Sequence, residues 1–245
     1  MKCINFDRAF ERYMAGWMKE NSEKYKDDMD VIEDMMPDVY LEFLQKPADF
    51  LDGVAPQNYF EQFDDADMLV GWLCDYIAQG VPVPDLLFER ITSLGESAEK
   101  SLLALLDRTD LPEETEMTVV SLLREMESQA PMQRYIDFIA SLEEPSDKGD
   151  LCAEALLSMG EAVVAPVLAA LSGAGQVGRD IFADILSNYP GDDRAIPMLK
   201  EAAQSPDINY LDYVEVVNAI EELGGERPPE REFSGDPYYE SLRRV

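Results

Sequence analysis

The sequence predicts an all-α fold: an α-α superhelix of about four to five helix pairs with a helical cap at its N-terminal end. Apolar residues recur at helical spacing along most of the chain. Corner positions recur every 30 to 34 residues between Leu94 and Leu223, which is the spacing of stacked helical repeats. A single helix pair cannot bury its own apolar stripe, so each pair is expected to pack against the pairs before and after it.

The first 80 residues are predicted to be a helical capping region without these corners. An apolar stripe that begins at Phe6 and ends at Trp17 has the spacing of an amphipathic helix. A second helical stretch over 22–44 is interrupted at Pro37, and a third ends at Gly80. This region is expected to cover apolar surface that the first helix pair would otherwise expose.

Residues 81–224 are predicted to form the repeat region. Segments 93–106 and 158–171 align at an offset of 65 with six of 14 residues identical, and a half-period copy lies at 122–142. In the clearest unit, a helix over 148–159 ends at Gly160, where a left-handed residue closes a helix at little cost. A second helix follows at once.

Residues 225–245 lose the helical periodicity and form a C-terminal tail. Its aromatic residues could dock on the last repeat as a cap or present a short motif to a partner. We favour the cap, because the final face of a stack needs cover.

The stretch "GDDRAIPMLKEA" (191–202) has the features of a turn that opens a second helix. Gly191 is expected to end the preceding helix, Asp192 to cap the next one, and Pro197 to lie within its first turns, where the missing N–H donor costs little. Ile196 and Leu199 would supply the inner face.

In these residues the chain resembles the HEAT-like repeat family named after the phycobilisome lyases. The resemblance covers roughly residues 84–224 and implies stacked helix pairs, which in most such proteins build binding scaffolds. Its pattern places an Arg early in the first helix and Gly-Asp-x-Arg-Ala-hydrophobic-Pro before the second. The matching residues are Arg179, Ala183, Gly191, Asp192, Arg194, Ala195, Ile196 and Pro197.

Charge is the unusual feature of the composition. The chain has 51 acidic and 20 basic residues, a net charge of −31, and no histidine. This field repels phosphate backbones and anionic membranes, so neither nucleic acid nor a membrane is expected as a partner. The negative charge would attract a basic segment of a partner protein, and repulsion between like-charged copies of the chain favours a monomer.

The three cysteines, Cys3, Cys74 and Cys152, are too far apart for a zinc motif and too few for a disulfide framework. We expect reduced thiols in a cytoplasmic protein. The N-terminal residues meet charge too early for a signal peptide, and no apolar run has the length of a membrane span.

No stretch of the sequence has a catalytic or cofactor motif. The absence of histidine excludes His-dependent triads and imidazole metal sites. Segment 172–180, "SGAGQVGRD", lacks the lysine of a phosphate loop and is interpreted as an inter-helix turn. Segment 64–68, "DDADM", lacks the oxygen ligands and the glycine register of a calcium loop. We therefore expect neither a cofactor, nor a metal, nor enzymatic activity.

The predicted function is a non-enzymatic protein–protein interaction scaffold that binds a partner on its curved surface. Two alternatives stay open: a bilin-lyase-like enzyme handling a tetrapyrrole, implied by the resemblance alone, and an acidic mimic of DNA, suggested by the charge. Polar residues expected on the second helices are the candidate contacts: Glu99, Lys100, Gln133, Arg134, Asp137, Arg194, Lys200 and Glu201.

Overall fold

The structure is a computed structural model, and every element that it describes is a helix, turn or loop, with no β-strand in the described ranges. The all-α prediction is therefore confirmed. The chain divides into two compact units, residues 1–122 and 123–245. The predicted boundary near residue 80 stays a prediction. The structure describes residues 3–21, 29–171, 173–189 and 195–242, without the side chains of 29–31.

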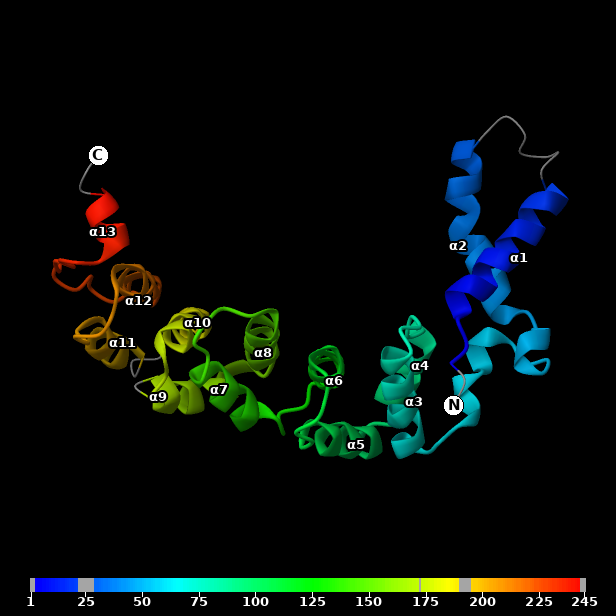
Figure 1. Ribbon diagram of the computed structural model, residues 1–245, viewed down its shortest axis with the longest axis horizontal. Helices are drawn as coiled ribbons and strands as arrows, with labels where there is room; N and C mark the ends of the chain where they lie inside the picture. Colours follow the sequence, from blue (N-terminus) through cyan, green and yellow to red (C-terminus); the bar gives the residue numbers. More distant parts are fainter. Residues whose placement is uncertain (1–2, 22–28, 172, 190–194, 243–245) are drawn as a thin grey trace. The chain divides into compact units, whose positions relative to one another are not determined.

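The first unit begins with two longer helices and continues through three short 3-10 helices into shorter helices (Figure 1). Pro37 lies inside α2, which continues unbroken from Met29 to Gln45, so the predicted interruption at Pro37 is wrong. The elements are α1 (Phe6–Asn21), α2 (Met29–Gln45), η1 (Asp49–Leu51), η2 (Pro56–Asn58), η3 (Phe60–Gln62), α3 (Ala66–Ala78), α4 (Asp85–Ser93) and α5 (Glu96–Leu106), followed by α6 (Glu113–Glu125), which contains the division between the units.

Aromatic side chains build the core of the first unit. Phe6 and Phe60 are buried with their ring centroids 5.7 Å apart, and Phe43 contacts the rings of both Phe10 and Phe50. Of the predicted α1 stripe only Phe6 is fully buried. The shape of this core is therefore set by rings from α1, α2 and the 3-10 helices together.

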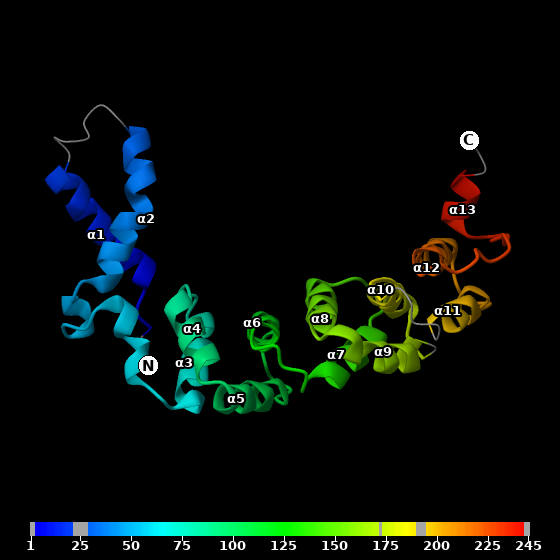
Figure 2. The same ribbon diagram turned by 180° about the vertical axis from the view of Figure 1, so that it is seen from behind.

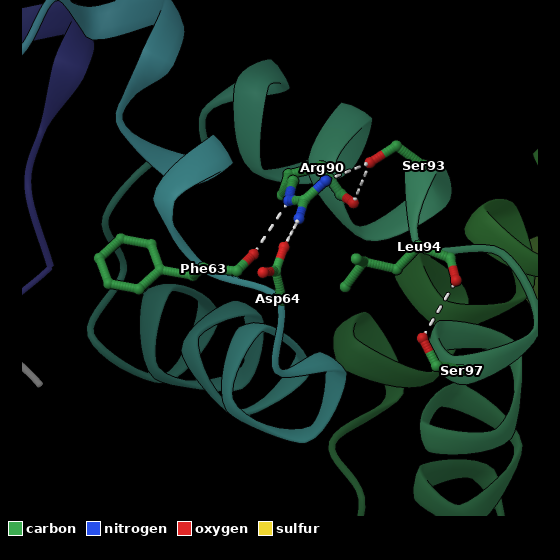
Figure 3. A network of polar contacts seen from close by, with 6 residues as sticks. All are labelled: Phe63, Asp64, Arg90, Ser93, Leu94 and Ser97. Carbon is green, nitrogen blue, oxygen red and sulfur yellow. Dashed lines mark hydrogen bonds and ion pairs between the residues drawn. The ribbon is translucent and has the colours of Figure 1, made fainter.

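Arg90 links α4 to residues 63–64, which lie just before α3. Its guanidinium donates to the Phe63 carbonyl (3.0 Å), the Ser93 hydroxyl (3.1 Å) and the Asp64 carboxylate (Figure 3). Asp65, the residue after Asp64, caps α3 by accepting a hydrogen bond from the Met68 N–H at 3.0 Å. The acidic "DDADM" segment thus has a role in helix capping and ion pairing.

The second unit contains two rows of helices. In both views α8, α10 and α12 lie along one side of the unit, and α7, α9 and α11 lie along the other (Figures 1 and 2). Consecutive members of each row are in contact. The elements are α7 (Met132–Ala140), α8 (Asp147–Ser158), η4 (Gly160–Val163), α9 (Val164–Leu171), α10 (Gln176–Ser187), α11 (Ala195–Ala203), α12 (Tyr210–Glu222) and α13 (Pro237–Leu242).

The corners of the second unit follow the predicted chemistry where the structure describes them. Gly160 and Gly224 have φ values of +70° and +80°, in the left-handed region that favours glycine. Pro197 is the third residue of α11, and Leu199 is fully buried. The predicted roles of Gly191 and Asp192 lie outside the described residues.

Three further expectations can be compared with the described residues. Cys3 and Cys152 are buried and Cys74 is half-buried, and none of the three forms a disulfide within the described residues. In the part of the chain that the structure describes, no helix has both the length and the apolar character needed to cross a lipid bilayer. Within the same ranges, no three acidic or cysteine side chains come together as a metal site would require.

Tyr135 of α7 provides a stability test of the second core. Its side chain is buried, and its hydroxyl has no hydrogen-bond partner among the described residues. An unpaired buried polar group costs free energy, so Tyr135→Phe should leave the free energy of unfolding unchanged or raise it by up to about 1 kcal/mol.

Tyr76→Phe is the matched control, because the Tyr76 side chain is buried like that of Tyr135, but its hydroxyl both accepts from the Ile4 N–H and donates to the Ile4 carbonyl. We expect this change to lower the free energy of unfolding by about 1 kcal/mol. Chemical denaturation followed by circular dichroism measures both values. A larger loss in Tyr135→Phe than in Tyr76→Phe would contradict the assignment.

Candidate functional site

The second unit contains a cavity of about 370 Å³ at one end of α11. Its walls come from the last residue of α9, the first turn of α10, residues 198–202 of α11 and the turn that follows α11. We call it the α11 pocket, and it is lined by Leu171, Arg179, Met198, Glu201, Ala202, Gln204, Ser205 and Pro206.

The chemistry of the α11 pocket is mainly apolar with two opposite charges. Leu171, Met198, Ala202 and Pro206 are apolar, whereas Arg179 and Glu201 bring a guanidinium and a carboxylate. Apolar walls with a few placed polar groups are typical of binding sites, since the walls supply affinity and the polar groups fix orientation.

Two glycines of the "SGAGQVGRD" segment, Gly175 before α10 and Gly178 in its first turn, set the position of α10 and with it Arg179. The Gly175 N–H donates to the Ala140 carbonyl at 3.1 Å. At Gly178 a Cβ atom would lie 2.6 Å from the Ile139 carbonyl oxygen, so only glycine allows α10 to approach the end of α7 this closely. Residues 173–175 form the predicted inter-helix turn, but the prediction is wrong for residues 176–180, which belong to α10, and the close contact with α7 was not predicted.

Arg179 is fixed at the pocket by its own turn. Its Nε donates to the Ala174 carbonyl at 3.0 Å, which holds the start of the guanidinium group against the backbone. The predicted pattern places an arginine early in this helix, and the structure puts it in the pocket wall.

The C-terminal tail contacts the turn after α11, which forms another part of the pocket wall. Arg231 donates to the carbonyls of Ala203 and Ser205, at 3.2 and 2.7 Å, and its guanidinium lies 5.1 Å from the ring centroid of Phe233. Phe233 is buried, and the Tyr213 hydroxyl donates to the Pro229 carbonyl at 3.0 Å. These contacts hold the turn after α11, which carries Ser205 of the pocket wall.

A pair of carboxyl groups, Asp180 of α10 and Asp212 of α12, lies between these two helices. Asp180 directly follows Arg179 of the pocket wall in the sequence. Asp180 and Asp212 share a side-chain hydrogen bond, Asp212 is only 5% exposed, and Oδ1 of Asp180 is buried without a partner among the described residues. Burial raises the pKa of Asp180 to about 8, and the negative charges of Asp212 and Glu215 act in the same direction, while Arg179 opposes them. Asp180 therefore holds a proton near neutral pH.

The pKa of Asp212 is also raised by burial, against hydrogen bonds from Asp180 and Gln176 and the charge of Arg179, which lower it. One proton shared by two carboxyl oxygens satisfies a pair that would repel if both groups were ionised. The packing of α10 on α12 is thus linked to this proton.

The predicted contact residues are distributed over three helices. Glu99 and Lys100 lie on α5 of the first unit, and Lys100 forms an exposed ion pair with Glu96 at 2.7 Å. Lys100 also borders a shallow, open depression with Asp65 and Asp67. These residues belong to a different unit from the α11 pocket.

The other predicted residues belong to the second unit. On α7 the exposed Gln133 donates to Asp137 at 2.8 Å, and Arg134 is exposed beside them. On α11 Glu201 lines the pocket and Lys200 is half-buried outside its lining. Arg194 lies outside the described residues. Among the predicted contacts that the structure describes, Glu201 alone lies in the pocket wall.

Sequence reasoning did not find the pocket or the carboxyl pair. Asp212 carried a usable signal, because it occupies an inward position of the α12 stripe, one turn before the buried Val216. An acid in an apolar stripe is expected to have a buried partner. The pocket had no such signal, because its walls are four separate segments.

Comparison with known proteins adds no family to this description. The chain matches no family model, no curated protein and no solved structure.

Proposed function

We propose that this protein is a non-enzymatic interaction module whose α11 pocket binds an extended segment of a partner protein. The observation that carries the proposal is an apolar cavity with Glu201 in its wall, in a chain with a net charge of −31. An apolar side chain of the partner would fill the cavity, and a nearby lysine or arginine would pair with Glu201. The N–H donors of Arg179 suit carbonyl groups of the partner's main chain.

The proposed architecture behind this pocket is a stack of HEAT-like helix pairs. It is supported within the second unit by the two rows of helices, in which each helix contacts the next member of its row (Figure 2). Left-handed glycines at the corners support it as well. Stacked helix pairs commonly present their contact surface along one row.

Selection from a phage library of random 15-residue peptides tests the proposed function. The enriched peptides should contain a large apolar residue within about one helical turn of a lysine or arginine. Ala202→Phe places a ring in the cavity and should weaken binding of these peptides at least about ten-fold, and Glu201→Lys by about three- to ten-fold.

Matched controls lie on exposed faces of the same unit. Ala165→Phe on α9 and Glu222→Lys on α12 change the same residue types outside the pocket and should leave the dissociation constant unchanged. Fluorescence polarisation of a labelled peptide gives the constants. No enriched peptide, or equal binding to Ala202→Phe, would refute the proposal.

A further inference from the structure

Large apolar side chains are exposed together on the first unit. Of the seven exposed large apolar residues in the described part of the chain, four fall within residues 36–50. Met36 is 39% exposed, Tyr40 40% and Phe50 45%. Single exposed apolar residues need no explanation, but a group of them marks an interaction surface.

Ring contacts connect these residues into one surface. Tyr40 and Phe50 both lie against the buried Phe43, with ring centroids 6.2 and 6.5 Å away. Met36 precedes Tyr40 by four residues on α2, so both belong to the same face of the helix. We call Met36, Tyr40 and Phe50 the α2 patch. It is continuous with the aromatic core but open to solvent.

Carboxylates lie near Tyr40 of the α2 patch and along α2. Burial raises the pKa of Tyr40, and the negative charges of Asp85 and Glu89 of α4 and Asp7 of α1 act in the same direction. Along α2 itself Glu33, Asp34, Asp38 and Glu42 are exposed. Lys46, the basic residue that directly follows α2, already forms an ion pair, with its Nζ 3.7 Å from Oε1 of Glu42. The patch is thus an apolar surface with an acidic rim.

We propose that the α2 patch is a docking surface for a cationic amphipathic helix of a protein partner. The apolar face of that helix would cover Met36, Tyr40 and Phe50, and its lysines or arginines would face Asp7, Asp85 and Glu89. An apolar helix face with basic flanks is the complement of such a surface. This site is separate in residues and in unit from the α11 pocket, so it does not depend on the proposed function.

Charge decides against the other occupants. A second copy of the chain would bring the same acidic rim against this one, and an anionic membrane would meet the same repulsion. A cationic helix gains both from covering the apolar patch and from the rim charges, and its affinity should fall as salt screens them.

The test uses the full chain and a fluorescein-labelled 18-residue peptide of leucine and lysine, with all leucines on one helical face. Fluorescence polarisation compares it with a scrambled peptide of the same composition. We expect the amphipathic peptide to bind at least about ten-fold more tightly than the scrambled one, because only the former presents a continuous apolar face.

Variants then locate the binding. Met36→Gln combined with Tyr40→Gln should weaken binding at least about ten-fold, whereas Leu211→Gln on α12, an apolar residue that is 48% exposed, should not. Asp85→Asn with Glu89→Gln should weaken binding several-fold and flatten its salt dependence. The exposed pair Asp184→Asn with Glu222→Gln serves as the charge control.

Each alternative has its own outcome. Equal binding of the scrambled peptide, or full affinity in the Met36/Tyr40 variant with native circular dichroism, would overturn the proposal. Two other results would also overturn it: a dimer of the wild-type chain in sedimentation experiments that the Met36/Tyr40 variant abolishes, or binding of the wild-type chain to phosphatidylcholine vesicles that this variant abolishes. Ala202→Phe should bind the amphipathic peptide as wild type does, which separates this result from the test of the α11 pocket.

Discussion

Asp180→Asn is expected to stabilise the second unit at pH 8 by on the order of 2 kcal/mol and to have almost no effect at pH 4. Asp180 has a folded-state pKa of about 8 against an ordinary value of 3.8. The full shift corresponds to more than this free energy, but Asp180 is only partly buried and solvent screens part of the interaction. An asparagine amide donates to Asp212 at every pH, as the protonated Asp180 does at low pH.

The sign follows from proton binding. A carboxyl with a raised folded-state pKa holds its proton more tightly in the folded chain than in the unfolded one. The stabilisation is full below the unfolded pKa, near 4, and is lost as the pH rises through the folded pKa, near 8. The groups that face this proton are Asp212 and Glu215 of α12 and Arg179 and Gln176 of α10.

Hydrogen exchange of α10 and α12 peptides, measured by mass spectrometry at pH values from 5 to 8.5 and corrected for the intrinsic exchange rate, checks this prediction. Wild type should lose protection in both helices with rising pH, and Asp180→Asn should keep it. Asp184→Asn, an exposed acid one turn further along α10, is the matched control and should behave as wild type. Parallel loss in wild type and Asp180→Asn would assign the effect to the general acidic charge instead.

Gly178→Ala is expected to lower the free energy of unfolding of the second unit by about 1–3 kcal/mol. The added methyl group would lie 2.6 Å from the Ile139 carbonyl oxygen and 3.2 Å from the Cα atom of Ala140. Both contacts are with backbone, so α10 has to move away from α7 as a whole. This movement also displaces Arg179, the next residue, in the wall of the α11 pocket.

Gly71→Ala separates this steric effect from the intrinsic helix preference of the two residues. Gly71 lies within α3, is exposed, and has no atom near the position of an added Cβ. Here the same change should raise the free energy of unfolding by about 0.5–1 kcal/mol. Thermal denaturation followed by circular dichroism compares the two, and a stabilised Gly178→Ala would show that α10 does not lie against α7 as described.

Local features of the fold were predictable because they depend on neighbours in sequence. The helix expected over 148–159 is observed at Asp147–Ser158, where Ser146 caps the start by accepting from the Gly149 N–H. Gly160 closes it as expected, with positive φ. In these places the apolar period, the cap and the glycine all indicate the same boundary.

Features made by distant segments were not predictable. The α11 pocket depends on how the turn after α11 lies against α9 and α10, and Arg231, from the tail, fixes that turn. Tyr40 is another example, since it lies on α2 beside the buried Val39 yet remains 40% exposed. Periodicity shows which face of a helix is apolar, but not how completely other elements cover that face.

Methionine-methyl NMR on the full chain tests the proposed binding role most directly. Met198 lines the α11 pocket, whereas Met68 lies on α3 of the first unit, and a Met198→Leu spectrum assigns the first signal. On titration with a peptide enriched by the phage selection, the Met198 methyl signal should shift in proportion to occupancy while the Met68 signal stays in place. Saturated binding with an unmoved Met198 signal would contradict the account.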